Sequence, residues 1–282
     1  MSRYVFSGHE SFQCKSLWLK KGYDFVKGGH TFTEESAVVQ LGVGRNMVIS
    51  IKHWLRAFGI IDDSGATTEI GDFIFGENGR DPFIEDISTK WFLHYQLIST
   101  DYASLYKKVF IDLHKERKEF SKSNVHSFIK RQFSERKFEN TIYNENTIEK
   151  DISTLLKNYV FPRNNKVYED FATLLIDLNL ISRLDRELYS FNYTSRVDTN
   201  PFIFLFALKD KAGVSKVVEY DLILEVGLAF CMSANDIQEA FEILNRFNPN
   251  ITFDNSAGEQ LFSINLDVTK FEILDWYYQA QR

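Results

Sequence analysis

The sequence is poor in the residues that break up a fold or cross-link it. Its 282 residues include only four prolines and 14 glycines, which argues against a disordered chain and against an all-β sandwich. The two cysteines, Cys14 and Cys231, form no Cys-x-x-Cys pair, so we expect free thiols in a reducing compartment. No apolar run has the length of a signal peptide or a membrane span. We therefore expect a cytoplasmic protein with no membrane partner.

Hydrophobic residues are plentiful, and charge is distributed unevenly. Hydrophobic residues make up 44% of the chain and 26 residues are phenylalanine, enough to bury a large core in one or two domains. The net charge is −6, yet residues 1–60 contain eight Lys and Arg against four Asp and Glu, and residues 103–137 contain ten against four. Because electrostatic contacts are local and screened over about 10 Å, such basic blocks can bind phosphate on an acidic chain. The alternative is that they are solvated helix faces.

Residues 34–75 have the pattern of a winged helix-turn-helix. A helix is predicted over Glu34–Leu41 with Thr33 as its N-cap, and a glycine turn separates it from a second helix over Arg45–Phe58. A short hairpin with the turn Asp62–Gly65 follows. Helix, tight turn, helix and hairpin, in that order, predict a winged domain. The buried stripe of the second helix consists of Val48, Ile51, Leu55 and Phe58.

The opposite face of this second helix is the candidate DNA-binding surface. Its residues recur at spacings of 4, 3 and 4, and most are basic. Long donors on one helix face can reach phosphates and base edges in the major groove, and the free N–H groups after Gly44 can hold a phosphate. An ordinary solvated face is the alternative. The stripe is Arg45, Ile49, Lys52 and Arg56, and the predicted DNA-binding residues are Gly44, Arg45, Asn46, Lys52, His53 and Arg56.

The rest of the chain is predicted to be helical with two further hairpins, so the fold class is mainly α with small β-hairpins. A helix followed by a hairpin recurs weakly near residues 168–193 and 234–265. Residues 1–145 are predicted to form a winged helix-turn-helix-like DNA-binding domain with a helical extension. Residues 146–282 are predicted to form a helical, winged-helix-like domain, whose acidic composition suits docking of partner proteins.

Four motifs in the first hundred residues, taken together, resemble one bacterial family. They are FSGHESF (Phe6–Phe12), WLKKG (Trp18–Gly22), LGVGRNMVISIKHW (Leu41–Trp54) and DPFIEDISTKWFLHYQL (Asp81–Leu97). In this order they resemble the SspB-type family, which is associated with DNA phosphorothioation defence clusters and was long without a functional name. Ile87 stands where a proline often follows Glu-Asp in that family, a change that affects only the start of a helix.

This resemblance implies a function in anti-phage defence. It implies a DNA-binding protein of a bacterial restriction-modification system that nicks double-stranded DNA to allow sulfur insertion. The implied partners are a cysteine desulfurase, an ATPase and a sulfurtransferase-like enzyme. One alternative is a non-catalytic DNA-binding adaptor that positions those enzymes, and another is a protein-interaction scaffold whose basic face is merely solvated.

Two places in the motifs carry candidate catalytic residues. Nicking of DNA usually needs a metal ion held by carboxylates, or a nucleophile with acid–base help. His9 could act as a general base or metal ligand, and Glu10 as a ligand. Asp81, Glu85 and Asp86 could hold a divalent ion, with Mg²⁺ or Mn²⁺ as the expected cofactor.

Each of these candidates also has a structural alternative. The His9-Glu10 loop could hydrogen-bond onto the helical domain instead of cutting DNA. Asp81 precedes Pro82, which is typical of a turn, and Asp86 stands where a helix N-cap belongs. His94 lies among aromatic residues and is predicted to be a core residue rather than a ligand. The sequence leaves both readings open at each position.

Overall fold

The computed structural model describes residues 5–135, 142–162, 173–194, 199–254, 261–265 and 267–280. It divides the chain into two compact units, unit 1 (Met1–Asn192) and unit 2 (Tyr193–Arg282). Residue 145, near which the sequence predicts a boundary, is the first residue of a helix within unit 1, and that helix packs on the helix before it.

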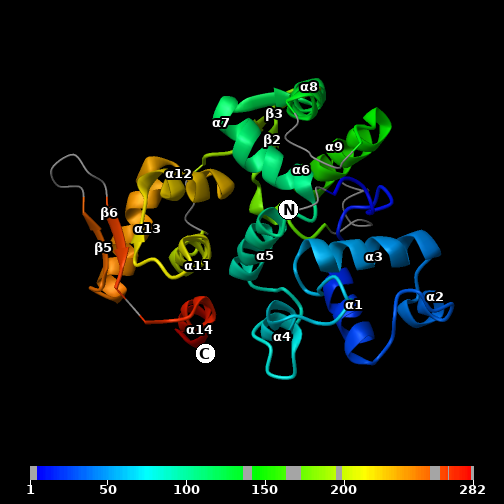
Figure 1. The fold of residues 1–282 in the computed structure, drawn as a ribbon, viewed down its shortest axis with the longest axis horizontal. Coiled ribbons are helices and arrows are strands. Elements are labelled where there is room, and N and C mark those ends of the chain that lie inside the picture. Colours follow the sequence, from blue (N-terminus) through cyan, green and yellow to red (C-terminus); the bar gives the residue numbers. More distant parts are fainter. Residues whose placement is uncertain are drawn as a thin grey trace. The chain divides into compact units, whose positions relative to one another are not determined.

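Unit 1 is built mainly from helices, which Figure 1 shows from blue to green. Helix α5 is its central element, since ten of its 13 residues are buried. The helices of unit 1 are α1 (Trp18–Lys27), α2 (Ala37–Leu41), α3 (Arg45–Ala57), α4 (Glu69–Phe75), α5 (Ile87–Ser99), α6 (Ser104–Lys107), the π-helix η1 (Lys108–Leu113), α7 (His114–Glu116), α8 (Lys122–Ser134), α9 (Glu145–Tyr159) and the 3-10 turn η2 (Ile176–Leu178).

The two helices predicted over residues 34–58 occur in the predicted order, but the first begins at Ala37 rather than at Glu34, so Thr33 is not its N-cap. Helix α1 packs against α3 (Figure 1), and Gly22 allows the close approach, because a Cβ there would lie 2.5 Å from Leu55 Cδ1. Gly42, with φ 59°, ends α2 in the left-handed conformation. A single β-bridge joins Ile61 to Thr67 after α3. A winged helix-turn-helix stays a prediction, whereas the helices and the turn between them are present.

Aromatic residues fill the centre of unit 1 between α5, η1 and α9. His94 is fully buried there, and its Nδ1 lies 2.7 Å from the hydroxyl of Tyr159. The ring of Phe110 packs 4.8 Å from both of these rings. Such packing, with the imidazole hydrogen-bonded to a phenol, is what a structural core histidine requires.

A small antiparallel sheet completes unit 1, in the order β1-β3-β2. Its strands are β1 (Glu119–Ser121), β2 (Ile181–Arg183) and β3 (Leu188–Phe191). The hairpin of β2 and β3 lies where the sequence predicts it. Strand β1 lies at the end of a segment predicted to be helical, and it pairs Phe120 with Tyr189 across about seventy residues of chain. Local periodicity carries no signal for such a distant partner.

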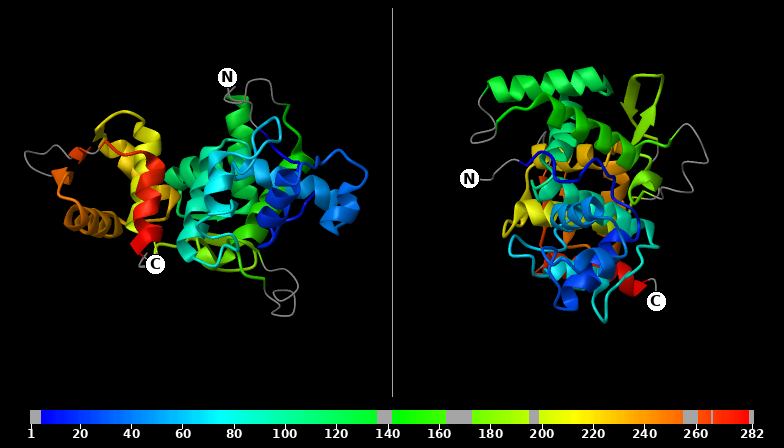
Figure 2. Two further views of the ribbon diagram at one scale, coloured as in Figure 1. Left: turned by 90° about the horizontal axis from the view of Figure 1, so that it is seen from below. Right: turned by 90° about the vertical axis from the view of Figure 1, so that its right-hand side faces the viewer.

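Unit 2 packs four helices against a second small sheet. Its elements are α11 (Pro201–Ala212), β4 (Val217–Val218), α12 (Tyr220–Ala229), α13 (Ala234–Phe247), β5 (Ile251–Asp254), β6 (Leu261–Ile264) and α14 (Lys270–Ala280). Helix α11 is the core, and α14 lies along it, as the red and yellow helices in Figure 2 show. The sheet order is β4-β6-β5, and its β5–β6 hairpin matches the predicted one. The predicted winged-helix-like character of this part is not tested by these observations.

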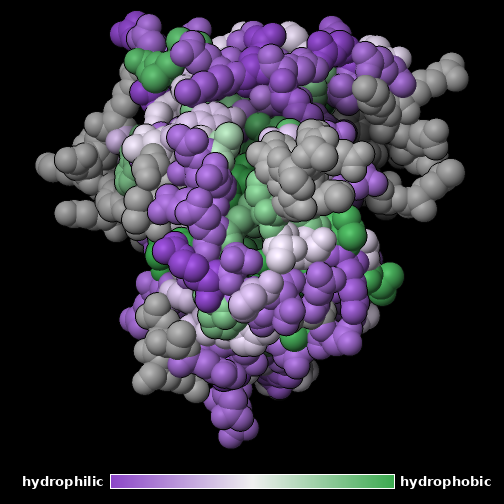
Figure 3. Space-filling view, turned by 90° about the vertical axis from the view of Figure 1, so that its left-hand side faces the viewer, coloured by the Kyte–Doolittle hydropathy of each residue, from purple (hydrophilic) through white to green (hydrophobic). Residues whose placement is uncertain are grey.

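One face of the molecule, drawn in Figure 3, is largely polar. Hydrophilic residues cover most of the face in Figure 3. Exposed apolar side chains also occur in unit 2, Val214, Val217 and Phe247 among them, and such residues are normal on protein surfaces. None of the helices in the described ranges combines the length and apolar character needed to cross a membrane. The mainly helical fold with small antiparallel sheets is confirmed. Of the helix predicted over residues 168–178, residues 168–172 lie outside the described residues, and residues 173–178 form a β-bridge, a turn and the 3-10 turn η2 instead.

Candidate functional site

The N-terminal loop of residues 7–11 crosses α3 and α9 in an unusual backbone conformation. Ser7, Gly8, Glu10 and Ser11 all have positive φ, at 78°, 102°, 47° and 63°. Residues other than glycine rarely adopt such angles, and they persist only where surrounding contacts hold them. The loop is therefore fixed by its tertiary contacts rather than by its own propensity.

Asp151 on α9 supplies the main contact that holds this loop. Its carboxylate is almost fully buried and accepts the backbone N–H of Ser7, which lies 3.0 Å from both oxygens. Nε2 of His9 lies 2.7 Å from the same carboxylate. Asp151 belongs to no motif and follows His9 by 142 residues. The sequence analysis therefore does not include it, and the sequence contains no local signal that identifies it.

The hydrogen bonds of His9 define its tautomer and its role. The backbone N–H of Ser11 donates to Nδ1 at 3.0 Å, so Nδ1 carries no proton. The proton therefore resides on Nε2, which donates it to Asp151. Both ring nitrogens of this buried side chain are committed inside the protein. This arrangement braces the loop, and His9 would have to break one of these bonds before it could act as a base or metal ligand.

His53 lies beneath the loop and has no polar partner. It is only 5% exposed, and neither ring nitrogen makes a hydrogen bond. Its ring packs edge-on at 5.6 Å from His9 and 5.1 Å from Trp54. Burial, with a smaller contribution from His9, lowers the pKa of His53 from 6.5 to about 3, so the ring is neutral at pH 7. His53 is one of the predicted DNA-binding residues, but its side chain points inward and is buried.

Glu10 differs from the buried His9 because its side chain is exposed. It stands at the turn of a loop whose other side is tied to α9, so its position is fixed while its side chain faces solvent. Of the two predicted catalytic residues in this loop, Glu10 is the one that is accessible.

The second predicted acidic cluster shapes the loop before α5. Both oxygens of the buried Asp81 carboxylate accept backbone N–H groups, from Glu85 and from Asp86, each at 3.0 Å. Asp86 in turn caps α5 through a 2.7 Å bond from the N–H of Ser88. The carboxylates of Asp81 and Asp86 thus serve local backbone structure, and Glu85 is exposed. Among the described residues, no three His, Cys, Asp or Glu side chains gather as a metal site.

The predicted DNA-binding stripe divides into an exposed and an engaged part. Arg45 and Asn46 in the first turn of α3 are exposed, and Lys52 is half-buried. Gly44 is the N-cap of α3 and has space around it. Arg56 instead donates to the carbonyl oxygen of Asp63 at 2.5 Å. Contacts with a ligand are therefore open to residues 44–46 and 52.

Gly8→Ala is expected to destabilise unit 1 by at least about 2 kcal/mol, because a strained φ alone costs about 1–3 kcal/mol. In addition, the new Cβ would lie 2.7 Å from Nδ1 of His53, whereas Gly65 has a similar φ of 91° with nothing within 4 Å. Urea denaturation of Gly8→Ala and the control Gly65→Ala isolates the effect of this contact. Equal losses in the two variants would contradict it.

Comparisons with known proteins place the chain in a family. A family model described as "Protein of unknown function (DUF4007)" matches residues 6–278. The chain is also similar to two solved structures, described as SspB and as magnesium ion-bound SspB, with TM-scores of 0.85 and 0.86. Each is 23% identical to this chain in sequence, and the match covers 98% of this chain and 88% of the solved chain. No curated protein matches the chain.

Proposed function

The chain belongs to the family described as a protein of unknown function (DUF4007), and on that basis we propose that it is a DNA-binding protein of a bacterial DNA phosphorothioation system. The observation that carries this proposal is the likeness of nearly the whole chain to SspB, together with the four N-terminal motifs. The expected partners are double-stranded DNA, a cysteine desulfurase, an ATPase and a sulfurtransferase-like enzyme. The expected role is in anti-phage defence.

The exposed part of α3 supports contact with duplex DNA. Arg45 and Lys52 lie on the same side of a helix preceded by a tight turn, and neither is ion-paired within the described residues. Unpaired cations on one helix face are suited to phosphate contact. We also propose that residues 34–75 act as a winged helix-turn-helix.

The double variant Arg45→Ala/Lys52→Ala is expected to bind a duplex about 60-fold more weakly at 0.1 M salt. Each lost phosphate contact reduces the slope of log K against log salt concentration by about 0.9, so two contacts reduce it by about 1.8. Fluorescence anisotropy with a labelled duplex across a salt series measures both quantities. The control Lys130→Ala/Lys150→Ala removes the same charge from exposed positions on α8 and α9. The duplex contact would be refuted by a slope that is the same in both double variants.

We further propose that the protein nicks DNA with Mg²⁺ or Mn²⁺. The donor chemistry of Glu10 fits such an ion, which is commonly held by one or two carboxylates and water. Asp81 fits poorly, because both of its oxygens already accept backbone hydrogen bonds. When bound, the ion would polarise a phosphate and neutralise its charge. The hydrogen bonds of Asp151 to His9 and to the backbone of Ser7 hold the loop and so fix the position of Glu10.

A plasmid assay tests the nicking proposal. Purified protein with Mg²⁺ or Mn²⁺ is expected to convert supercoiled plasmid to the open-circular form, and EDTA should stop the conversion. Glu10→Ala should reduce the rate at least about tenfold, a loss of about 1.4 kcal/mol in transition-state stabilisation. The control Glu239→Ala changes an exposed glutamate of unit 2 and should leave the rate unchanged. Metal-dependent nicking that survives Glu10→Ala would move the site, with Glu85 as the next candidate.

The non-catalytic adaptor is the second candidate function. The observation that favours it is the commitment of His9 to internal hydrogen bonds, since a base should be free to accept a proton. Duplex binding without any nicking by the purified protein would support the adaptor and move the chemistry to the partner enzymes.

A further inference from the structure

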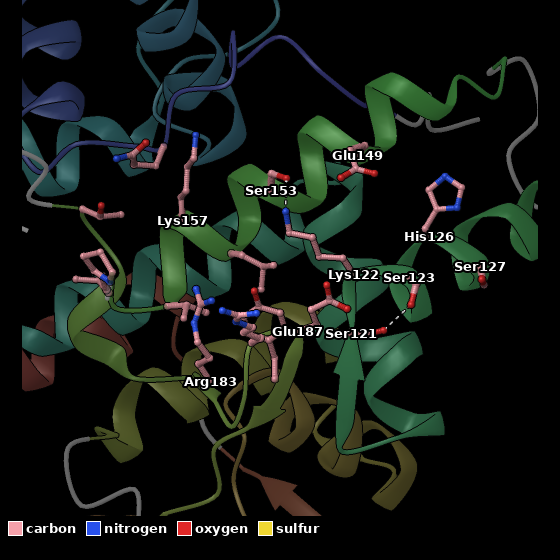
Figure 4. A pocket seen from close by; sticks show the side chains of 18 of the residues that line it. Ser121, Lys122, Ser123, His126, Ser127, Glu149, Ser153, Lys157, Arg183 and Glu187 are labelled. Atoms are coloured by element: carbon pink, nitrogen blue, oxygen red, sulfur yellow. Dashed lines mark hydrogen bonds between the residues drawn. The ribbon is translucent and has the colours of Figure 1, made fainter. Parts of the chain in front are cut away.

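A large cavity in unit 1 lies apart from the exposed stripe of α3. It has a volume of about 1180 Å³ and is formed by α8, α9 and the β2–β3 hairpin. Figure 4 shows Lys122 reaching toward Ser153 on α9, the helix that also carries Glu149, with Arg183 on the hairpin. This volume exceeds the usual 300–1,000 Å³ of a small-molecule pocket, so the cavity has room for more than one small ligand group.

Four cations that line this cavity lack an anionic partner. They are Lys122, Lys157, Arg183 and Arg186. Lys122 donates to the hydroxyl of Ser153 at 2.8 Å, and Lys157 lies 3.3 Å from the carbonyl oxygen of Ser11. Within the described part of the chain, none of the four forms an ion pair with a carboxylate. Such groups attract an anionic ligand, since their charge is not neutralised by the protein.

Several other cations of unit 1 form ion pairs with carboxylates. Lys27 lies 2.8 Å from Asp72, and Lys107 lies 2.8 Å from Asp101. Arg131, on the same helix as Lys122, pairs with Glu116. Some cations of unit 1 are thus neutralised by the protein, whereas the four around the cavity, like Arg45 and Lys52 of α3, form no ion pair within the described residues.

The remaining polar groups of the cavity identify the kind of anion. Four serines line it, Ser121, Ser123, Ser127 and Ser153, and hydroxyls commonly donate to phosphate oxygens. Three exposed glutamates also line it, Glu145, Glu149 and Glu187. A simple polyanion would be repelled by these carboxylates. A nucleic acid strand suits both the cations and the glutamates. Its backbone phosphates are anionic, and the amino groups of its bases can donate hydrogen bonds to carboxylates.

The cavity adjoins the N-terminal loop. Gln13 lines it, and Lys157 contacts the backbone of Ser11, one residue from Glu10. A strand held in the cavity would therefore run next to the loop that carries the proposed catalytic carboxylate.

We propose that this cavity binds a single strand of nucleic acid through its phosphodiester backbone. The proposal rests on the proposed DNA function and adds a second contact surface to it, separate from α3. Lys122 and Lys157 hold phosphates from opposite helices, and the arginines of the hairpin close the third side.

The test measures binding of a fluorescein-labelled 12-nucleotide single strand. Lys122→Ala/Lys157→Ala is expected to bind about 25-fold more weakly at 0.1 M salt, with a salt slope smaller by about 1.4, because each phosphate contact on a single strand contributes about 0.7. Arg183→Ala/Arg186→Ala should show a loss of the same kind. The control Lys130→Ala/Lys150→Ala removes equal charge from α8 and α9 outside the cavity and should bind as the wild type does.

The outcomes separate this proposal from the proposed function. If the cavity variants and the control variant bind the single strand with equal affinity, the proposal that the cavity binds the strand is overturned. Wild-type protein that binds the duplex but not the single strand also overturns it, and leaves the DNA function standing. Wild-type protein that binds neither overturns both. Retained single-strand binding in Arg45→Ala/Lys52→Ala, with duplex binding lost, would establish two separate surfaces.

Discussion

Asp151→Ala is expected to destabilise unit 1 by about 2–5 kcal/mol, because each buried donor left without an acceptor costs about 1–3 kcal/mol. Two donors would be stranded, the backbone N–H of Ser7 and Nε2–H of His9. The loop they belong to has four positive φ angles and no regular secondary structure, so its own propensity cannot replace the lost contacts.

Urea unfolding followed by tryptophan fluorescence measures this loss. Trp54 reports on the loop itself, since its indole N–H donates to the carbonyl oxygen of Phe12 at 3.1 Å. Asp151→Asn keeps one acceptor oxygen in the same shape and should lose less than Asp151→Ala. Lys150→Ala, at the adjacent exposed position, should stay within about 0.5 kcal/mol of the wild type. An unfolding midpoint for Asp151→Ala equal to that of Lys150→Ala would show that Asp151 does not hold the loop.

The local elements were predictable because their signals are local. The stripe of Val48, Ile51, Leu55 and Phe58 is buried as its spacing predicts. Asp86 caps the helix that follows it, where the sequence places an N-cap. Each of these features depends on residues within one or two turns of helix, where periodicity and capping chemistry act.

The candidate site was less predictable, because its decisive contacts join distant residues. The sequence raises two readings of His9, a catalytic group or a brace, and cannot choose between them. The choice depends on Asp151, which α9 brings to the loop from a part of the chain without a motif. The same applies to His53, whose helix position fits the edge of an exposed stripe until the loop covers it. The cavity walls likewise come from segments that only the tertiary fold brings together.

His53→Leu is expected to make unit 1 less sensitive to acid. The pKa of His53 is about 3 in the folded protein, against about 6.5 when the chain is unfolded. As pH falls through 6.5 the unfolded chain gains a proton that the folded protein does not, so stability falls between about pH 6.5 and pH 3 and the loss is complete below that. Leucine has no proton to gain. Its advantage over the wild type should therefore grow by about 3 kcal/mol from pH 7 to pH 4.

The comparison needs a variant that removes the charge but keeps a polar group. His53→Gln cannot titrate, so it should share the flatter pH dependence of His53→Leu. It should nevertheless be less stable than His53→Leu at pH 7, because it leaves a polar group buried where the structure offers His53 no hydrogen bond. Urea midpoints at pH 7, 6, 5 and 4 measure both effects in one series. Stability curves of the wild type and both variants that run parallel over this range would mean that His53 is reached by solvent, and that the loop opens more readily than its hydrogen bonds to Asp151 imply.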